Sequence, residues 1–307
     1  KPLYYTFADD NFIFASEIKA ILKHPAVTAK VDSTGICELF GIGPAHTPGT
    51  CAFKNIFEIK PAHYAILNRS GFHIQEYWKL ISKPHKDTFD ETCEKVKFLL
   101  DDSIKRQLVS DVPLCLMLSG GLDSSIITAY ASNYCKENNL PPLDTYSIDY
   151  VDNDKNFVKS DFQPNSDNYY INIMKNAFNT KHHSIVIDTP ELANCLEDAM
   201  IARDLPGMAD VDSSLLLFCK NIKNDATVAL SGECSDEIFA GYPWFFREDA
   251  LQSNTFPWSI AIKERQNLLN PDIQKIVDLK EYIDYRYLQS LSHMDELVYA
   301  DLIRQVR

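Results

Sequence analysis

The chain has 307 residues, with 30 Lys and Arg against 43 Asp and Glu and a formal net charge of −13 at pH 7. A chain of this length buries about 75% of its unfolded surface, so we expect a sizeable core in one large domain or two smaller ones. The acidic balance argues against a nucleic-acid partner. The lack of a leader or of an apolar run of membrane length argues against export and membrane insertion.

The eight cysteines include no C-x-x-C pair and stand inside apparent strands and helices. This pattern predicts reduced thiols in a cytoplasmic protein. Cys37 and Cys51 match no nucleophile motif, so we assign them no catalytic role. His46 and His63 have no partner at metal-ligand spacing and are interpreted as loop residues.

Alternating apolar residues predict a β-rich first segment. Strands are expected over residues 3–7 and 12–15, with further antiparallel pieces between residues 56 and 78. Short helices are expected over residues 17–22 and 33–40. Because the sequence starts without Met and inside a strand-like pattern, we expect it to be a piece of a longer protein.

A polar connector, Ser82-Lys-Pro-His-Lys-Asp87, separates this segment from the rest. We place a domain boundary there, which gives predicted domains of 1–82 and 83–307. Thr88-Phe-Asp-Glu91 has the form of a capping box and predicts a helix start. The core face of that helix is expected to carry Phe89, Val96, Leu99, Leu100 and Ile104.

The apolar run Leu114-Cys-Leu-Met-Leu118 leads directly into Ser119-Gly-Gly-Leu-Asp-Ser-Ser125. This order predicts a buried strand, a tight turn and a helix start. Gly120 and Gly121 allow a sharp bend and a close approach of the backbone to a ligand. The serines add hydroxyl donors, and a helix that opens near Ser124 directs its free N–H groups at the loop. The stretch therefore predicts an anion-binding cradle.

The chemistry of that anion follows from the charges in the loop. The lysine of a Walker loop is missing, and Asp123 stands in the same region. A carboxylate beside phosphate repels it unless Mg2+ lies between them, so Asp123 predicts a magnesium-bridged polyphosphate. The alternative is an ordinary strand-to-helix turn that is capped by serine.

Strand and helix patterns alternate beyond this loop, which predicts a parallel sheet with helices on both faces. Strands are expected over residues 145–148, 183–187 and 227–230, and helices over 124–138, 168–178, 190–201 and 215–222. A second motif, Leu230-Ser-Gly-Glu-Cys-Ser-Asp-Glu-Ile-Phe-Ala-Gly-Tyr242, follows the last of these strands. Ligands of open α/β sheets bind at the carboxyl ends of strands, where both motifs fall. The chain past Trp258 has a charged helical pattern without a readable motif.

The two motifs carry a family resemblance. The loop from Ser119 to Ser125 resembles the pyrophosphate loop of the ATP pyrophosphatases, which leave an adenylylated substrate. The second motif resembles the synthetase domain of the glutamine-dependent asparagine synthetases. This resemblance implies an α/β domain like the adenine nucleotide alpha hydrolases. It also implies that aspartate, ATP and glutamine or ammonia are converted into asparagine, AMP and pyrophosphate through a β-aspartyl-AMP intermediate.

The resemblance also implies roles for individual residues. Asp123 and Asp236 would hold Mg2+ on the departing pyrophosphate, and Glu233 would act in the attack of ammonia on the activated carboxyl group. Ile148 would lie against adenine, although a core position explains it too. The remaining nucleotide-binding residues would be Leu118, Ser119, Gly120, Gly121, Ser124, Ser125, Ser231 and Gly232. Cys234 stands where many relatives have glycine.

Pro2-Leu-Tyr-Tyr5 and Phe14-Ala-Ser-Glu-Ile-Lys-Ala20 resemble the closing part of the N-terminal glutaminase domain of the same synthetases. The first domain is thus expected to be the β-rich remnant of an N-terminal-nucleophile fold, whose catalytic cysteine would lie upstream of Lys1. The catalytic lysine of the later synthetase segment cannot be located. A homodimer is the assembly to test.

Three points stay open on the sequence alone. Asp210, Asp212 and Ser213 either shape the amino-acid site or are solvated loop residues and a helix cap. A β-lactam synthetase shares the architecture, but it would ignore aspartate and adenylylate a bulkier amino acid. A homologue that binds nucleotide without catalysis is the other alternative, although such a protein needs neither Glu233 nor the two magnesium acids together.

Overall fold

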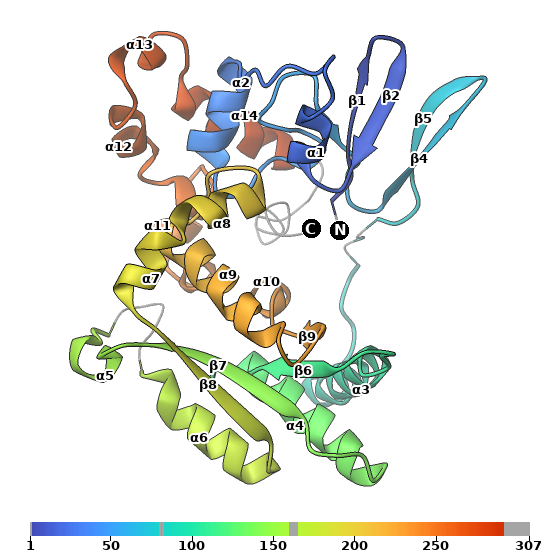
Figure 1. The fold of residues 1–307 in the computed structure, drawn as a ribbon, viewed down its shortest axis with the longest axis vertical. Coiled ribbons are helices and arrows are strands. Elements are labelled where there is room, and N and C mark those ends of the chain that lie inside the picture. The colour runs from blue at the N-terminus through green and yellow to red at the C-terminus, as the bar shows by residue number, and fades with distance from the viewer. Residues whose placement is uncertain (1, 80, 82, 160–164, 292–307) are drawn as a thin grey trace. The chain divides into compact units, whose positions relative to one another are not determined.

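The computed structural model describes residues 2–79, 81, 83–159 and 165–291 (Figure 1). The chain packs as two compact units. The first contains the segment that ends at Lys83, Met200–Met208 and the segment that begins at Phe239. The second contains the described residues between Pro84 and Ala199 and those between Ala209 and Ile238. The domain boundary after residue 82 stays a prediction.

The second unit is built on a parallel sheet with the strand order β8-β7-β6-β9 in the described part of the chain. Residues of all four strands lie in register across it: Leu116 of β6 stands between Leu230 of β9 and Thr145 of β7, and Thr145 is paired with His182 of β8. The strands are β6 Leu114–Met117, β7 Asp144–Tyr150, β8 Lys181–Ile187 and β9 Val228–Leu230. The predicted parallel sheet is confirmed.

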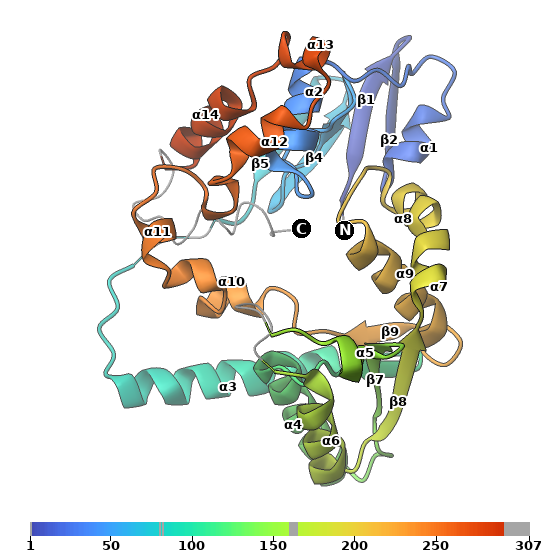
Figure 2. The same ribbon diagram turned by 90° about the vertical axis from the view of Figure 1, so that its left-hand side faces the viewer.

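Both faces of the sheet are covered by helices, as the alternation of side chains requires (Figures 1 and 2). Cys115 of β6 packs with Phe218 of α9 on one face, whereas Leu116 packs with Ala131 of α4 on the other. The described helices of this part are α3 Phe89–Gln107, α4 Leu122–Glu137, α5 Asn153–Asn156, α6 Asp167–Phe178, α7 Thr189–Asn194, α9 Asp210–Ile222 and α10 Ser235–Phe239. Helix α8 Leu196–Arg203 begins in this unit and ends in the first, to which the last residue of α10 also belongs.

Two predicted helix starts are wrong. Helix α4 begins at Leu122 rather than at Ser124, because Gly121 in an extended conformation is its N-cap. Helix α9 begins at Asp210 rather than at residue 215, so Asp210 and Asp212 lie in its first turn, where the helix dipole favours acids. The helix predicted over 190–201 is divided into α7 and α8.

The capping box of α3 is confirmed, because Thr88 and Glu91 bond each other's backbone N–H groups. Its predicted core face is partly wrong. Ile104 is buried, but the side chains of Phe89 and Leu99 are exposed. Helical spacing identifies an apolar stripe, and which part of a long helix is covered depends on the elements beside it.

The first unit is β-rich at its start, as predicted. Strand β1 Tyr4–Ala8 lies between β2 Asn11–Ala15 and β3 Phe57–Glu58, and β4 His63–Asn68 pairs with β5 Gly71–Glu76. Its helices are α1 Ile18–Leu22, α2 Ser33–Cys37, η1 Glu38–Ile42, η2 Pro243–Phe245, α11 Glu248–Leu251, η3 Pro257–Ser259, α12 Ile262–Asn267, α13 Pro271–Gln274 and α14 Leu279–Leu291.

Segments far apart in the sequence share the core of this unit. Cys37 and Ile42 pack in one cluster with Leu279 and Ile283 of α14. The buried carboxylate of Glu38 stabilises the same junction, because it accepts hydrogen bonds from the Thr47 N–H and hydroxyl groups at 2.7 Å each and from the Tyr282 hydroxyl, beside Arg286. Helical residues between Phe256 and Leu291 therefore pack against residues 36–45 of the same unit.

None of the eight cysteines forms a disulfide. Among the described residues, no helix is both long and apolar enough to cross a bilayer.

Candidate nucleotide and metal site

The strand order of the second unit contains a reversal at β6. Strands β6, β7 and β8 follow one another across the sheet, but β9 pairs with the opposite edge of β6. In open α/β sheets, the crevice at the carboxyl ends of the strands on either side of such a reversal binds ligands. The two sequence motifs follow β6 and β9, so the topology brings both to this position.

The first motif forms a tight turn that is held by its own serines. Leu118 is buried, and its N–H donates to the carbonyl oxygen of Tyr146 at 2.8 Å. Ser124 Oγ lies 3.0 Å from Ser119 Oγ, accepts from the Ser119 N–H at 3.2 Å and donates to the Gly121 carbonyl at 3.2 Å. The N–H of Ser125 bonds the Gly121 carbonyl at 3.1 Å. Ser119 Oγ also accepts the Gly121 N–H at 3.3 Å, so both serines shape the turn, and Ser119 is the exposed one.

Gly120 is required by both conformation and space. Its φ is +83°, in the left-handed region that L residues rarely adopt. A Cβ at this position would lie 2.7 Å from the carbonyl oxygen of Asp167. The turn therefore approaches the start of α6 as closely as backbone permits.

The second motif makes a comparable turn before α10. The Glu233 N–H donates to Ser231 Oγ at 3.3 Å, and the Ser235 N–H donates to the Gly232 carbonyl at 3.2 Å. Cys234 has a φ of +72°, so a cysteine occupies a left-handed position. This conformation is the physical reason why glycine suits that place. The side chain of Glu233 is exposed.

The two turns touch. A Cβ on Gly232 would lie 3.0 Å from Cβ of Asp123 and 3.3 Å from the backbone nitrogen of Ser124. These distances are tighter than ordinary van der Waals contact, so glycine favours the close approach of the second loop to the first turn of α4. The contact brings together motifs that are about a hundred residues apart in the sequence.

The carboxylates of the two turns repel each other. Burial raises the pKa of Asp123, its own backbone N–H opposes that shift, and the charge of Glu237 raises it further. Burial also raises the pKa of Asp236, and the charges of Asp123 and then Glu237 add to the effect. Neither aspartate has an ion-pair partner among the described residues. This cluster therefore attracts cations.

The donors suit a hard divalent cation such as Mg2+. Magnesium in nucleotide enzymes is held by one or two carboxylates, with phosphate oxygens and waters in the other positions. In the described part of the chain, no group of three His, Cys, Asp or Glu side chains is arranged to hold a metal. Asp123 and Asp236 would supply two ligands, and the nucleotide would supply others.

Ile148 and Ser213, which the sequence singles out, and His182 of β8 make structural contacts. The side chain of Ile148 packs against the core cluster under α9. His182 bonds Thr145 Oγ1 at 3.0 Å and Ser147 Oγ at 3.1 Å, and burial lowers its pKa. Ser213 is fully buried in α9. The role of Ile148 toward adenine stays a prediction.

Glu237 is the acidic residue of the site that sequence reasoning missed. It follows Asp236 directly, in the first turn of α10, and its side chain is buried. Neither carboxylate oxygen has a hydrogen-bond partner among the described residues. Its place as a second acid in the motif was a visible signal, but the burial of its side chain was not.

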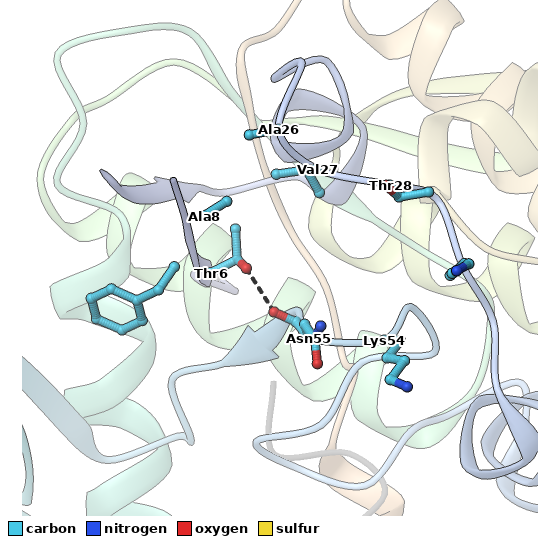
Figure 3. Close-up of a pocket in the computed structure, with 9 residues that line it drawn as sticks. Thr6, Ala8, Ala26, Val27, Thr28, Lys54 and Asn55 are labelled. Atoms are coloured by element: carbon cyan, nitrogen blue, oxygen red, sulfur yellow. Dashed lines mark hydrogen bonds between the residues drawn. The ribbon is translucent and has the colours of Figure 1, made fainter. Parts of the chain in front are cut away.

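A hollow in the first unit contains none of the motif residues. It has a volume of about 270 Å³ and lies beside β1, where the Thr6 hydroxyl donates to the Asn55 carbonyl at 2.7 Å (Figure 3). Lys30 and Lys54 also line it. Among the described residues, no Cys, His, Asp or Glu lines this hollow.

The sequence matches known families along most of its length. The asparagine synthase family model matches residues 95–305, and the glutamine amidotransferase domain model matches residues 1–78. The chain belongs to the asparagine synthase family. The predicted resemblance is thereby confirmed, as is the α/β fold class with its β-rich preceding segment.

Individual relatives agree with this membership. The chain is 52% identical over 292 residues to glutamine-hydrolysing asparagine synthetase 3 of Bacillus subtilis. The aligned region covers 95% of this chain and 47% of that protein. It is 29% identical to asparagine synthetase 1 of the same organism, over 79% of this chain and 36% of that protein. Amidase chyE of Penicillium rubens is 28% identical, over 84% of this chain and 38% of that protein. The chain thus spans less than half of each of these three relatives.

Proposed function

We propose that this chain carries the ATP-dependent synthetase site of a glutamine-hydrolysing asparagine synthetase. The observation that supports the proposal is the contact between the two motif turns, where Gly232 lies against Asp123 at the reversal of strand order. In the proposed reaction, the β-carboxylate of aspartate attacks the α-phosphorus of ATP and pyrophosphate leaves. Ammonia, from glutamine or from solution, then displaces AMP to give asparagine.

The first step requires compensation of negative charge. The exposed Ser119 and the backbone of Gly120 and Gly121 would bind phosphate oxygens, and Ser231 and Gly232 would lie near the α-phosphate or ribose. Asp123 and Asp236 would hold Mg2+. When bound, the ion would offset the charge that builds on the leaving pyrophosphate. The two aspartates would orient it from opposite turns.

The second step requires a proton acceptor. Ammonia becomes cationic as it attacks a carbonyl carbon, so a nearby carboxylate can take its proton or stabilise its charge. Glu233 is suited to this role because its side chain is exposed on the turn next to the proposed metal acids. Its backbone is held by Ser231, which leaves the carboxylate available to the substrate.

The proposal is tested by isotope exchange. The full-length protein is incubated with ATP, labelled pyrophosphate, Mg2+ and aspartate, and the label in ATP is counted. We expect exchange that depends on aspartate, because formation of β-aspartyl-AMP is reversible. Exchange with a bulkier amino acid but not with aspartate would identify a β-lactam-type synthetase. Nucleotide binding without any exchange would identify a non-catalytic homologue.

The setting of the reaction is also proposed. The eight cysteines, none of which forms a disulfide, support a cytoplasmic location, where disulfides are rare. The amidotransferase match over residues 1–78 supports glutamine as the nitrogen donor of the whole protein. A homodimer remains the assembly to test by sedimentation of the full-length protein.

A further inference from the structure

Buried glutamates in this protein fall into two kinds. Glu38 accepts hydrogen bonds from Thr47 and Tyr282, and Glu58 lies 2.8 Å from His46 and accepts the N–H of Gly49 at 3.3 Å. Glu237 is 4% exposed, and both of its oxygens lack a hydrogen-bond partner among the described residues. A buried carboxylate without a partner is costly to the fold unless a cation balances it.

The position of Glu237 indicates which cation that is. It follows Asp236 in the first turn of α10, and the turn before it lies against Asp123 through Gly232. Its charge acts on Asp123, Asp236 and Cys234, so its carboxylate lies within electrostatic range of both motif turns. Asp123, Asp236 and Glu237 thus lie within electrostatic range of one another, and none of them has an ion-pair partner among the described residues.

We propose that Glu237 is a third acidic group of the divalent-cation site, which strengthens binding of the ion between Asp123 and Asp236 without being one of its ligands. The proposal rests on the function inferred above. A role outside the ligand set follows because the described residues contain no cluster of three acids that could hold a metal directly. A buried charge still acts beyond contact distance, since screening inside a protein is weak.

The first test measures cation binding. Full-length protein with α,β-methylene-ATP, which cannot be cleaved between the α and β phosphates, is titrated with Mn2+ as the probe, and free Mn2+ is followed by electron paramagnetic resonance. Glu237→Gln is expected to weaken Mn2+ binding about tenfold or more, because it removes one charge from the field on the ion. Glu94→Gln, the same change at an exposed position of α3, is expected to leave the affinity unchanged.

The second test measures stability without metal. In EDTA, Glu237→Gln is expected to raise the Tm, because it removes an unpartnered buried charge that repels two neighbours. Glu38→Gln is the matched control, and it is expected to lower the Tm because that carboxylate is fully hydrogen-bonded. Excess Mn2+ with the nucleotide analogue should stabilise the wild type more than Glu237→Gln.

Two results would overturn the proposal. One is an unchanged Mn2+ affinity in Glu237→Gln. The other is a lower metal-free Tm in Glu237→Gln, which would mean that a basic side chain pairs with Glu237 in the full-length protein. Either can occur while the wild type exchanges pyrophosphate, in which case only this inference is lost. A wild type that binds no Mn2+ and exchanges no pyrophosphate would instead overturn the proposed function.

Discussion

At the amino ends of strands β7 and β8, charged and polar groups are paired. Asp144 accepts a hydrogen bond from His183 Nε2 at 2.7 Å and lies 3.0 Å from Lys181 Nζ, and the Tyr146 hydroxyl donates to Asp225 at 2.9 Å. At the carboxyl ends of β6 and β9, the acids of the two motif turns have no such partners among the described residues. The polar groups at one end of the sheet are paired, whereas the acids at the other end have no ion-pair partner among the described residues.

This difference indicates that the amino ends of the strands contribute to stability, whereas the carboxyl ends carry the proposed site. Burial alone would raise the pKa of Asp144, but hydrogen bonds from His183 and Lys181 outweigh it and lower that pKa. The pKa values of Asp123 and Asp236 are raised instead. Replacing aspartate by asparagine should therefore destabilise the protein at the amino end of the sheet and stabilise the metal-free protein at the carboxyl end.

The largest effect is expected for Asp236→Asn. Without one of the two proposed magnesium ligands, aspartate-dependent pyrophosphate exchange should fall by at least about a hundredfold. In EDTA, however, the Tm should rise, because the substitution removes repulsion from Asp123 and Glu237. Exchange and thermal unfolding are measured on the same preparation. A variant that keeps its exchange rate would remove Asp236 from the site.

A large structural effect is expected for Gly120→Ala. The new Cβ would meet the Asp167 carbonyl at 2.7 Å in a left-handed conformation, which should destabilise the protein by about 1–3 kcal/mol in urea unfolding and abolish exchange. Gly121→Ala is the matched control, since Gly121 has a φ of −68° and its nearest contact would be Ser119 Oγ at 3.3 Å. Equal losses in both variants would contradict a specific need for glycine at 120.

Asp144→Asn is expected to destabilise the protein slightly, whereas Asp236→Asn is expected to stabilise it in the absence of metal. Asp144→Asn should lower the free energy of unfolding by about 0.5–1 kcal/mol at pH 7, because Asp144 is only half-buried, and it should leave exchange intact. The lowered pKa of Asp144 contributes stability above its unfolded value of 3.8, and this is lost as the pH falls through the folded value.

Urea unfolding of Asp144→Asn and wild type between pH 7 and pH 3 checks this sign, since the gap between them should close in acid. Asp198→Asn breaks the exposed pair with Lys220, at 3.2 Å, and serves as the control. If Asp198→Asn lowers the free energy of unfolding as much as Asp144→Asn does, the pairs at the amino end of the sheet contribute no more to stability than an exposed ion pair.

The smallest effect is expected for Cys234→Gly. A left-handed conformation costs an L residue about 1 kcal/mol, but glycine adds entropy to the unfolded chain, so a net gain of about 0–0.5 kcal/mol is expected. Cys234→Ala keeps the Cβ and should give no such gain. Chemical denaturation compares the two. If Cys234→Gly proves less stable than Cys234→Ala, the left-handed conformation is not what limits stability at this position.

Much of the fold could be predicted from local pattern. The apolar run from Leu114 to Leu118, the later alternation of strands and helices and the capping box at Thr88 each determine structure through neighbouring residues, and the structure confirms them. The exposure of Phe89 and the early start of α9 could not be predicted, because they depend on which elements cover a helix and on how its first turn is held.

The sequence by itself determined that two acidic, glycine-bearing turns follow buried strands, because the spacing and type of residues are local properties. The same two motifs were enough to identify the family. Only the tertiary structure decided that β9 pairs with β6, that Gly232 therefore lies on Asp123, and that Glu237 is buried without a partner among the described residues. Strand order and burial arise from long-range packing, which no single stretch of sequence encodes. A carboxylate in an exposed turn is screened by water, whereas packing that removes the water strengthens its attraction for a cation.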